Sequence, residues 1–225
     1  MHSPRIHVET IGAEARPVVV IDDFAPDPQA LIDAAATAAF QPLGPFYPGL
    51  RAPVGRDYFT GLNRVLADVA RQVFGAADRL AVDRALYSIS TTPPGELSLP
   101  QRIPHIDNTD PNKLAIVHYL SRTDFGGTAF YRHRSTGFEA ITPDRHRPYL
   151  DALQADIAVK GEPPAAYISG DTDLFEQTAA FEPVFNRALI YRGNLLHCAL
   201  LPNDTALPAD PTRGRLTVAA FLTVA

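Results

Sequence analysis

The chain has 225 residues, with 20 Lys or Arg against 25 Asp or Glu, and therefore a formal net charge of −5. Because 46% of its residues are hydrophobic and 20% charged, it can bury a substantial core and is not a disordered chain. The acidic balance argues against a nucleic-acid or anionic-membrane surface, and the single cysteine, Cys198, excludes an internal disulfide or a zinc cluster.

Targeting signals are also missing from the pattern. No apolar run approaches the roughly 20 residues that span a bilayer, and residues 1–20 lack the basic and apolar segments of a secretory signal. We therefore expect a cytoplasmic globular protein that binds neither nucleic acid nor membrane. The sequence leaves the oligomeric state open, with a homodimer as one option.

The N-terminal third predicts one strand and two helices. Residues 17–21 form an apolar run typical of a buried strand. A helix follows, with Asp27 as its N-cap and Pro28 at its first position. Residues 41–57 are rich in Pro, Gly and Tyr and predict a long loop. Apolar residues at helical spacing predict a second helix over residues 62–74.

From about residue 84 the pattern changes to short apolar segments separated by Pro and Gly. Six strands are predicted, at residues 85–90, 114–121, 128–132, 188–192, 195–200 and 216–224. A polar insert at residues 142–161 predicts one further helix. This order favours an α+β, mainly β protein, in which two or three helices pack against two antiparallel sheets of a small barrel or jelly roll.

One short motif has the spacing of a metal site. Non-haem Fe(II) enzymes bind the metal through two imidazoles and one carboxylate, which leaves other coordination positions open. In His105-Ile106-Asp107, alternate residues at the end of a strand would point the same way. A second imidazole must then come from a distant strand, and His197 lies within one.

The motif is weak when taken alone. With 7 His and 18 Asp in the chain, chance gives about half a His-x-Asp match. His7-Val8-Glu9 satisfies a similar pattern, but it precedes every predicted element, whereas His105 follows a strand and precedes others. The alternatives are ordinary ones: a solvated turn for His105 and Asp107, and a core imidazole for His197.

The order of the later segments strengthens the metal-site hypothesis. His-x-Asp is followed by a strand at 114–121, a second strand opened by Gly126-Gly127, the distal His197 and a last strand with an arginine at its start. This order resembles the 2-oxoglutarate- and Fe(II)-dependent dioxygenases, especially their prolyl 4-hydroxylase-like branch. The resemblance covers roughly residues 17–225, and only the motifs from His105 onward are specific.

The resemblance implies a fold. It is a double-stranded β-helix, jelly-roll and cupin-like, with N-terminal helices packed on the major sheet. A single dioxygenase-like domain would span residues 1–225, with a helical support at about 1–83 and the β-helix core at about 84–225.

The resemblance also implies an activity. His105, Asp107 and His197 would bind Fe(II), with 2-oxoglutarate and O2 at the open positions. The expected reaction converts 2-oxoglutarate to succinate and oxidises a C–H bond of a small-molecule or peptide substrate. Asp107 favours hydroxylation, because related halogenases replace this carboxylate with a small residue. A non-catalytic cupin-like protein that binds a small molecule or a metal is the alternative.

Four residues are candidate contacts of the cosubstrate. Arg215 or Arg213 would bind the distal carboxylate of 2-oxoglutarate, because a guanidinium grips a carboxylate through two parallel hydrogen bonds. Arg215 is favoured, since it lies within the strand and shares a face with Thr217. Tyr87 would hydrogen-bond 2-oxoglutarate, or serve as a half-buried structural tyrosine. Separately, the composition of residues 47–51 predicts a tight turn, which could fold over the pocket as a lid.

Overall fold

The computed structural model describes residues 3–76 and 80–224. The predicted single domain also extends over residues 1, 2, 77–79 and 225, which lie outside the described residues. No helix within the described ranges is long and apolar enough to cross a membrane. The elements are, in chain order, β1 (Arg5–Ile11), β2 (Arg16–Asp22), α1 (Pro28–Ala36), β3 (Gln41–Pro42), β4 (Gly49–Pro53), η1 (Arg56–Phe59), α2 (Asn63–Phe74), β5 (Leu80–Ser90), η2 (Pro94–Glu96), η3 (Leu99–Gln101), β6 (Lys113–Tyr119), β7 (Thr128–His133), α3 (Pro143–Lys160), β8 (Phe175–Phe181), β9 (Ala188–Arg192), β10 (His197–Ala199) and β11 (Leu216–Val224).

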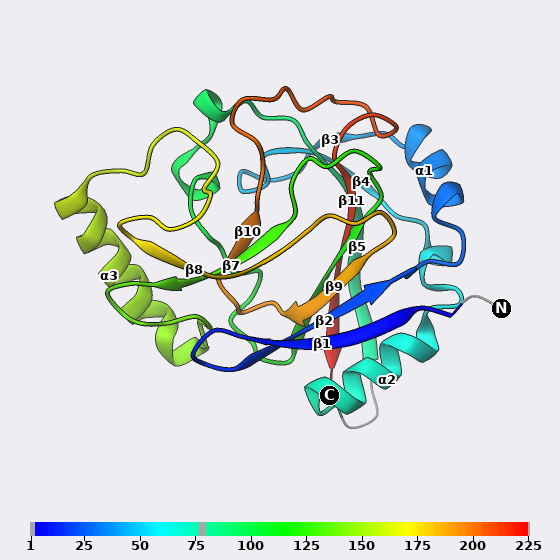
Figure 1. The fold of residues 1–225 in the computed structure, drawn as a ribbon, viewed down its shortest axis with the longest axis horizontal. Coiled ribbons are helices and arrows are strands. Elements are labelled where there is room, and N and C mark those ends of the chain that lie inside the picture. Colours follow the sequence, from blue (N-terminus) through cyan, green and yellow to red (C-terminus); the bar gives the residue numbers. More distant parts are fainter. Residues whose placement is uncertain (1–2, 77–79, 225) are drawn as a thin grey trace.

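Two antiparallel sheets make up most of the fold (Figure 1). The larger sheet has the strand order β1-β2-β9-β6-β11-β5-β4-β3, and the smaller has the order β10-β7-β8. The C-terminal strand β11 lies between β5 and β6, so pairing joins segments far apart in the sequence. The mainly β, two-sheet prediction is confirmed, and the arrangement agrees with a jelly roll.

The structure adds strands that the sequence pattern did not predict. The edge strand β1 is exposed except at Ile11, so it lacks the apolar run of a buried strand and is held by its pairing with β2. The loop expected at 41–57 contains β3 and β4, whose Gly and Pro are usual loop signals. The part expected to be a helical support therefore also supplies β1 to β4 of the larger sheet. The strand β8 was likewise absent from the prediction.

The alternation of side chains along β11 separates two faces of the larger sheet. Leu216, Val218 and Ala220 lie in one hydrophobic cluster with residues of both N-terminal helices. The helical members of that cluster are Ile32 and Ala35 of α1, and Leu66, Val69, Ala70 and Phe74 of α2. Burying each large apolar side chain contributes roughly 1.5–3 kcal/mol.

The opposite face of the larger sheet looks toward the smaller one. Tyr119 and Tyr191 from the larger sheet share a second cluster with Phe130 and Phe181 from the smaller sheet. A third cluster, which contains Cys198, joins the outer side of the smaller sheet to α3. In Figure 1, α3 lies on the side of the molecule away from α1 and α2. The space between the sheets is where functional side chains can gather.

A buried histidine lies on the helix-facing side of β6. His118 Nε2 is 2.9 Å from Asn186 Oδ1, and its Nδ1 is 3.3 Å from the hydroxyl of Tyr58. Asn186 also accepts a hydrogen bond from the amide of Ala25 and donates one to the carbonyl of Ala25. The imidazole thus belongs to a network that ties the N-terminal segment to the sheet, and its burial lowers the pKa of His118 to about 4.

This histidine makes stability depend on pH. Because the pKa of His118 is about 4 in the folded chain and 6.5 ordinarily, the unfolded chain takes up the proton first as the pH falls. The contribution is complete above pH 6.5 and is lost as the pH falls toward 4, by roughly 3 kcal/mol in all. Urea unfolding at pH 7.5 and 5 should show a smaller loss in a His118→Gln variant than in the wild type. Equal losses in both would contradict this prediction, and exposed His146 provides the control, as His146→Gln.

Candidate metal centre

His105 and His197 come together because their segments form an antiparallel bridge. The N–H of each donates to the carbonyl of the other over 2.9 Å, and side chains of directly opposed residues project to the same side. Two residues further on, the N–H of Asp107 donates to the carbonyl of Gly193 over 2.8 Å. Backbone pairing therefore holds the His105–Asp107 segment against the strand that carries His197.

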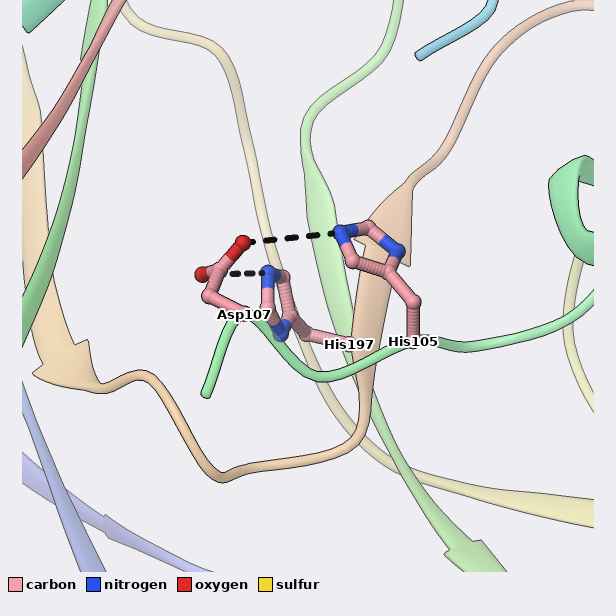
Figure 2. Close-up of side chains that lie close together, drawn as sticks. All are labelled: His105, Asp107 and His197. Carbon is pink, nitrogen blue, oxygen red and sulfur yellow. Dashed lines mark ion pairs between the residues drawn. The ribbon is translucent and has the colours of Figure 1, made fainter. Parts of the chain in front are cut away.

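The three side chains converge (Figure 2). His197 Nε2 lies 3.4 Å from Asp107 Oδ2, and His105 Nε2 lies 3.9 Å from Asp107 Oδ1. The centroids of the two imidazole rings are 4.4 Å apart. One potential ligand atom from each residue lies within 4.8 Å of the other two, which allows a single cation to contact all three.

The distal imidazole is held in a defined orientation. His197 Nδ1 donates to the carbonyl of Leu195 over 2.8 Å, which turns Nε2 toward Asp107. The rings of Tyr191 and Phe130 lie 4.8 and 6.2 Å from the imidazole. The side chain of His197 is 6% exposed and that of His105 is 52% exposed, so the triad has one closed side and one open side.

Burial shifts the pKa of two triad residues, downward for His105 and upward for Asp107. Desolvation lowers the pKa of His105 well below its ordinary value, and the nearby charges of His197 and Arg51 lower it further. Desolvation raises the pKa of Asp107, against the opposing effects of His197, Arg51 and Arg84. Although half of the His105 side chain is accessible, dense protein around it disfavours the charged ring. A neutral imidazole is the form that binds a metal.

A row of polar side chains crosses the same face of the larger sheet. Arg51 on β4 pairs with Ser88 on β5, Ser88 with Thr217 on β11, and Thr217 with Tyr119 on β6. Directly paired residues share a face, so all four point toward the interior between the sheets. Arg215, two residues before Thr217, points the same way.

Arg215 is fixed by backbone carbonyls. It is 3% exposed, and its Nε and Nη2 donate to the carbonyls of Gly126 and Gly127, both over 3.0 Å. A Cβ at Gly126, where φ is +89°, would lie 1.5 Å from the carbonyl oxygen of Leu200, so this position requires glycine. The Arg215 guanidinium lies 5.8 Å from the ring of Tyr119, and its Nη1 makes no hydrogen bond to the described residues.

Two of the predicted cosubstrate residues do not face the triad. Arg213 is exposed in the turn before β11. Tyr87 lies on the helix-facing side of β5, paired with Val218, and its ring is 6.5 Å from that of Phe40. The alternation of β5 places Ser88, not Tyr87, on the interior face. Tyr87 is therefore a core residue, because strand register decides which parity faces the site.

The sequence reasoning missed Arg51 and Ser88. The turn expected at residues 47–51 is not a lid, since its last three residues begin β4 and Arg51 lies in that strand. The signal was a lone basic residue between Leu50 and Ala52, which becomes meaningful only when β4 is recognised as a strand with alternating faces.

Comparison with known families identifies the chain. A family model described as "Family of unknown function (DUF6445)" matches residues 2–222. The chain belongs to this family. No curated protein matches the sequence significantly.

Solved structures share the fold of this DUF6445 chain. HygX from Streptomyces hygroscopicus, with nickel, 2-oxoglutarate and hygromycin B bound, is 14% identical, with a TM-score of 0.51 over 94% of this chain and 84% of that one. A prolyl-4-hydroxylase from Pseudomonas putida is 12% identical, with a TM-score of 0.50 over 94% and 95%. The non-heme alpha ketoglutarate dependent epimerase SnoN from nogalamycin biosynthesis is 13% identical, with a TM-score of 0.50 over 92% and 78%. These likenesses establish a common fold.

Proposed function

We propose that this protein is an Fe(II)- and 2-oxoglutarate-dependent oxygenase of the prolyl 4-hydroxylase-like branch, which acts as one domain and hydroxylates its substrate. The observation that carries the proposal is the convergence of His105, Asp107 and His197 from segments ninety residues apart. Two imidazoles and one carboxylate on one side of a cation, with the other side open, are the donor set of non-haem Fe(II) oxygenases.

The residues present also fit the cosubstrate. Arg215 is buried on the interior face, and its Nη1 makes no hydrogen bond to the described residues, so a carboxylate there would find a charged donor. Arg215 and Thr217 are the residues that would hold the distal carboxylate of 2-oxoglutarate, with the free Nη1 of Arg215 available to it.

Each part of the site then has a separate task. When bound, Fe(II) and 2-oxoglutarate supply the oxidising chemistry. His105, Asp107 and His197 hold the cation, and the carbonyl of Leu195 keeps the His197 ring in its ligating tautomer. The rings of Tyr191 and Phe130 exclude water from the closed side. The substrate would approach from the exposed side of His105.

Hydroxylation is the reaction that Asp107 favours. The solved structures of this fold include an epimerase as well as a prolyl-4-hydroxylase, so the fold alone does not specify the oxidation. A carboxylate at position 107 occupies the place that a halide would need. This supports oxygen transfer to a C–H bond of a small molecule or peptide.

A succinate assay tests the proposed function. Protein purified without oxygen is given Fe(II), 2-oxoglutarate and then O2, with no-iron and His105→Ala controls. We expect succinate above both controls even without substrate, because such oxygenases turn over slowly when uncoupled. Tight metal binding without succinate above the controls would contradict the proposal and favour a non-catalytic cupin-like binding protein.

A further inference from the structure

Arg51 is a half-buried cation with no carboxylate partner among the described residues. Its Nε is buried and makes no hydrogen bond to those residues. The ring of Tyr47 covers the guanidinium at 4.1 Å, and the Tyr47 hydroxyl is 3.2 Å from Ser90 Oγ. The side chain is therefore held in place by stacking while part of its fork stays unused.

Arg51 lies on the interior face of the larger sheet, the face from which Tyr191 packs against the His197 ring. Its strand, β4, borders β5, and Arg51 shares the interior face with Thr217, two strands and about 10 Å away. The side chain is thus on the side of the sheet that faces the candidate metal centre.

A second arginine without a carboxylate partner lies on the same face of the larger sheet. Arg84, an exposed residue of β5, pairs with Phe221, and its guanidinium lies 5.1 Å from the Phe221 ring. None of the described carboxylates forms an ion pair with Arg51 or Arg84. Positive side chains without a counter-charge on one face favour the approach of an anion.

A buried hydroxyl completes the group. Ser88 is paired with Arg51 across neighbouring strands, is 1% exposed, and has an Oγ without a partner in the described part of the chain. A carboxylate seated there would accept hydrogen bonds from the Arg51 fork and from this hydroxyl.

The cosubstrate does not account for this group. Of the two carboxylates of 2-oxoglutarate, one lies at the metal in the proposed function and the other at Arg215. Arg215 precedes β11 and is fixed by the carbonyls of Gly126 and Gly127, whereas Arg51 and Ser88 lie on β4 and β5. Arg51 and Ser88 are therefore left for a different molecule.

We propose that Arg51, with Ser88, binds a carboxylate of the substrate, so that the enzyme oxidises a carboxylate-bearing small molecule. The inference rests on the proposed function in taking the triad as the place of oxidation. The anion site itself consists only of residues of this chain and can be tested without turnover.

Fluorine NMR with matched probes tests the site. The Zn(II)-loaded protein, saturated with 2-oxoglutarate, is titrated with 4-fluorobenzoate and with neutral 4-fluorobenzamide. We expect the benzoate to bind about tenfold more tightly than the amide, and about tenfold more weakly after Arg51→Gln, since hydrogen bonds to charged groups are worth that much. Arg51→Lys should keep part of the affinity. Arg64→Gln, at a side chain 96% exposed, should keep all of it.

Three outcomes overturn the proposal. Equal binding of the two probes, or an Arg51→Gln variant that binds benzoate like the wild type, removes the anion site. A loss of 2-oxoglutarate affinity in Arg51→Gln, where we expect a change within about twofold, makes Arg51 a cosubstrate residue instead. Arg51-dependent benzoate binding by metal-free protein, together with no iron-dependent succinate, would retain the anion site and reject the oxygenase function.

Discussion

Replacing His197 with alanine is expected to abolish iron binding and iron-dependent succinate formation. The imidazole is 6% exposed, lies 3.4 Å from Asp107 and is oriented by the carbonyl of Leu195, so no nearby group can take its place. Loss of an outer partner of a metal ligand typically lowers metal affinity about 10–100-fold, so loss of the ligand itself should exceed about hundredfold. Anaerobic Fe(II) titration by calorimetry measures the affinity directly.

His7 offers a matched control. It belongs to His7-Val8-Glu9, which has a similar His-x-carboxylate spacing, but it is half exposed on the edge strand β1, 3.3 Å from the Glu9 carboxylate. A His7→Ala variant should bind iron like the wild type. Thermal unfolding of both variants separates a lost ligand from a lost fold. A folded His197→Ala variant that keeps wild-type iron affinity would rule out the metal centre.

Replacing Arg215 with glutamine should weaken 2-oxoglutarate binding by at least about tenfold, because the hydrogen bond from its charged Nη1 to the carboxylate is lost. The same change should lower the free energy of unfolding by roughly 1–3 kcal/mol for each carbonyl left unpaired at Gly126 and Gly127. Arg215→Lys keeps the charge without the planar fork, so its 2-oxoglutarate affinity and its stability should lie between those of the wild type and of Arg215→Gln. Calorimetry on the Zn(II)-loaded protein and urea unfolding provide the two measurements.

Arg213 is the control for this experiment. It is exposed in the turn before β11, so Arg213→Gln should change neither the cosubstrate affinity nor the stability. If Arg213→Gln weakened 2-oxoglutarate binding and a folded Arg215→Gln variant did not, the assignment of the cosubstrate residue would be reversed.

The sequence alone was sufficient to predict the two N-terminal helices, because their ends are set by neighbouring residues. Asp27 caps α1 through a hydrogen bond from the amide of Ala30 to its Oδ1 over 3.0 Å, as its position before Pro28 predicts. Gly75 ends α2 with a φ of 71°. Capping and helical spacing depend on residues within one turn of each other, so they can be read along the chain.

The three residues of the candidate metal centre were also accessible from the sequence. The His-x-Asp spacing and the order of the strands pointed to His105, Asp107 and His197, and in the structure their potential ligand atoms lie within 4.8 Å of one another. A short motif carries its own geometry when its members lie two residues apart on an extended segment. The pairing of that segment with the strand of His197 supplies the rest.

The lining of the site was decided by tertiary structure alone. Tyr87 and Ser88 are neighbours in the chain and differ only in parity, and the pairing of β5 with β11 and β4 determines which of them faces the interior. The same pairing makes Arg51 part of a strand and turns it toward the triad. The period along a strand is local, but which face meets the other sheet is a property of partners distant in the sequence.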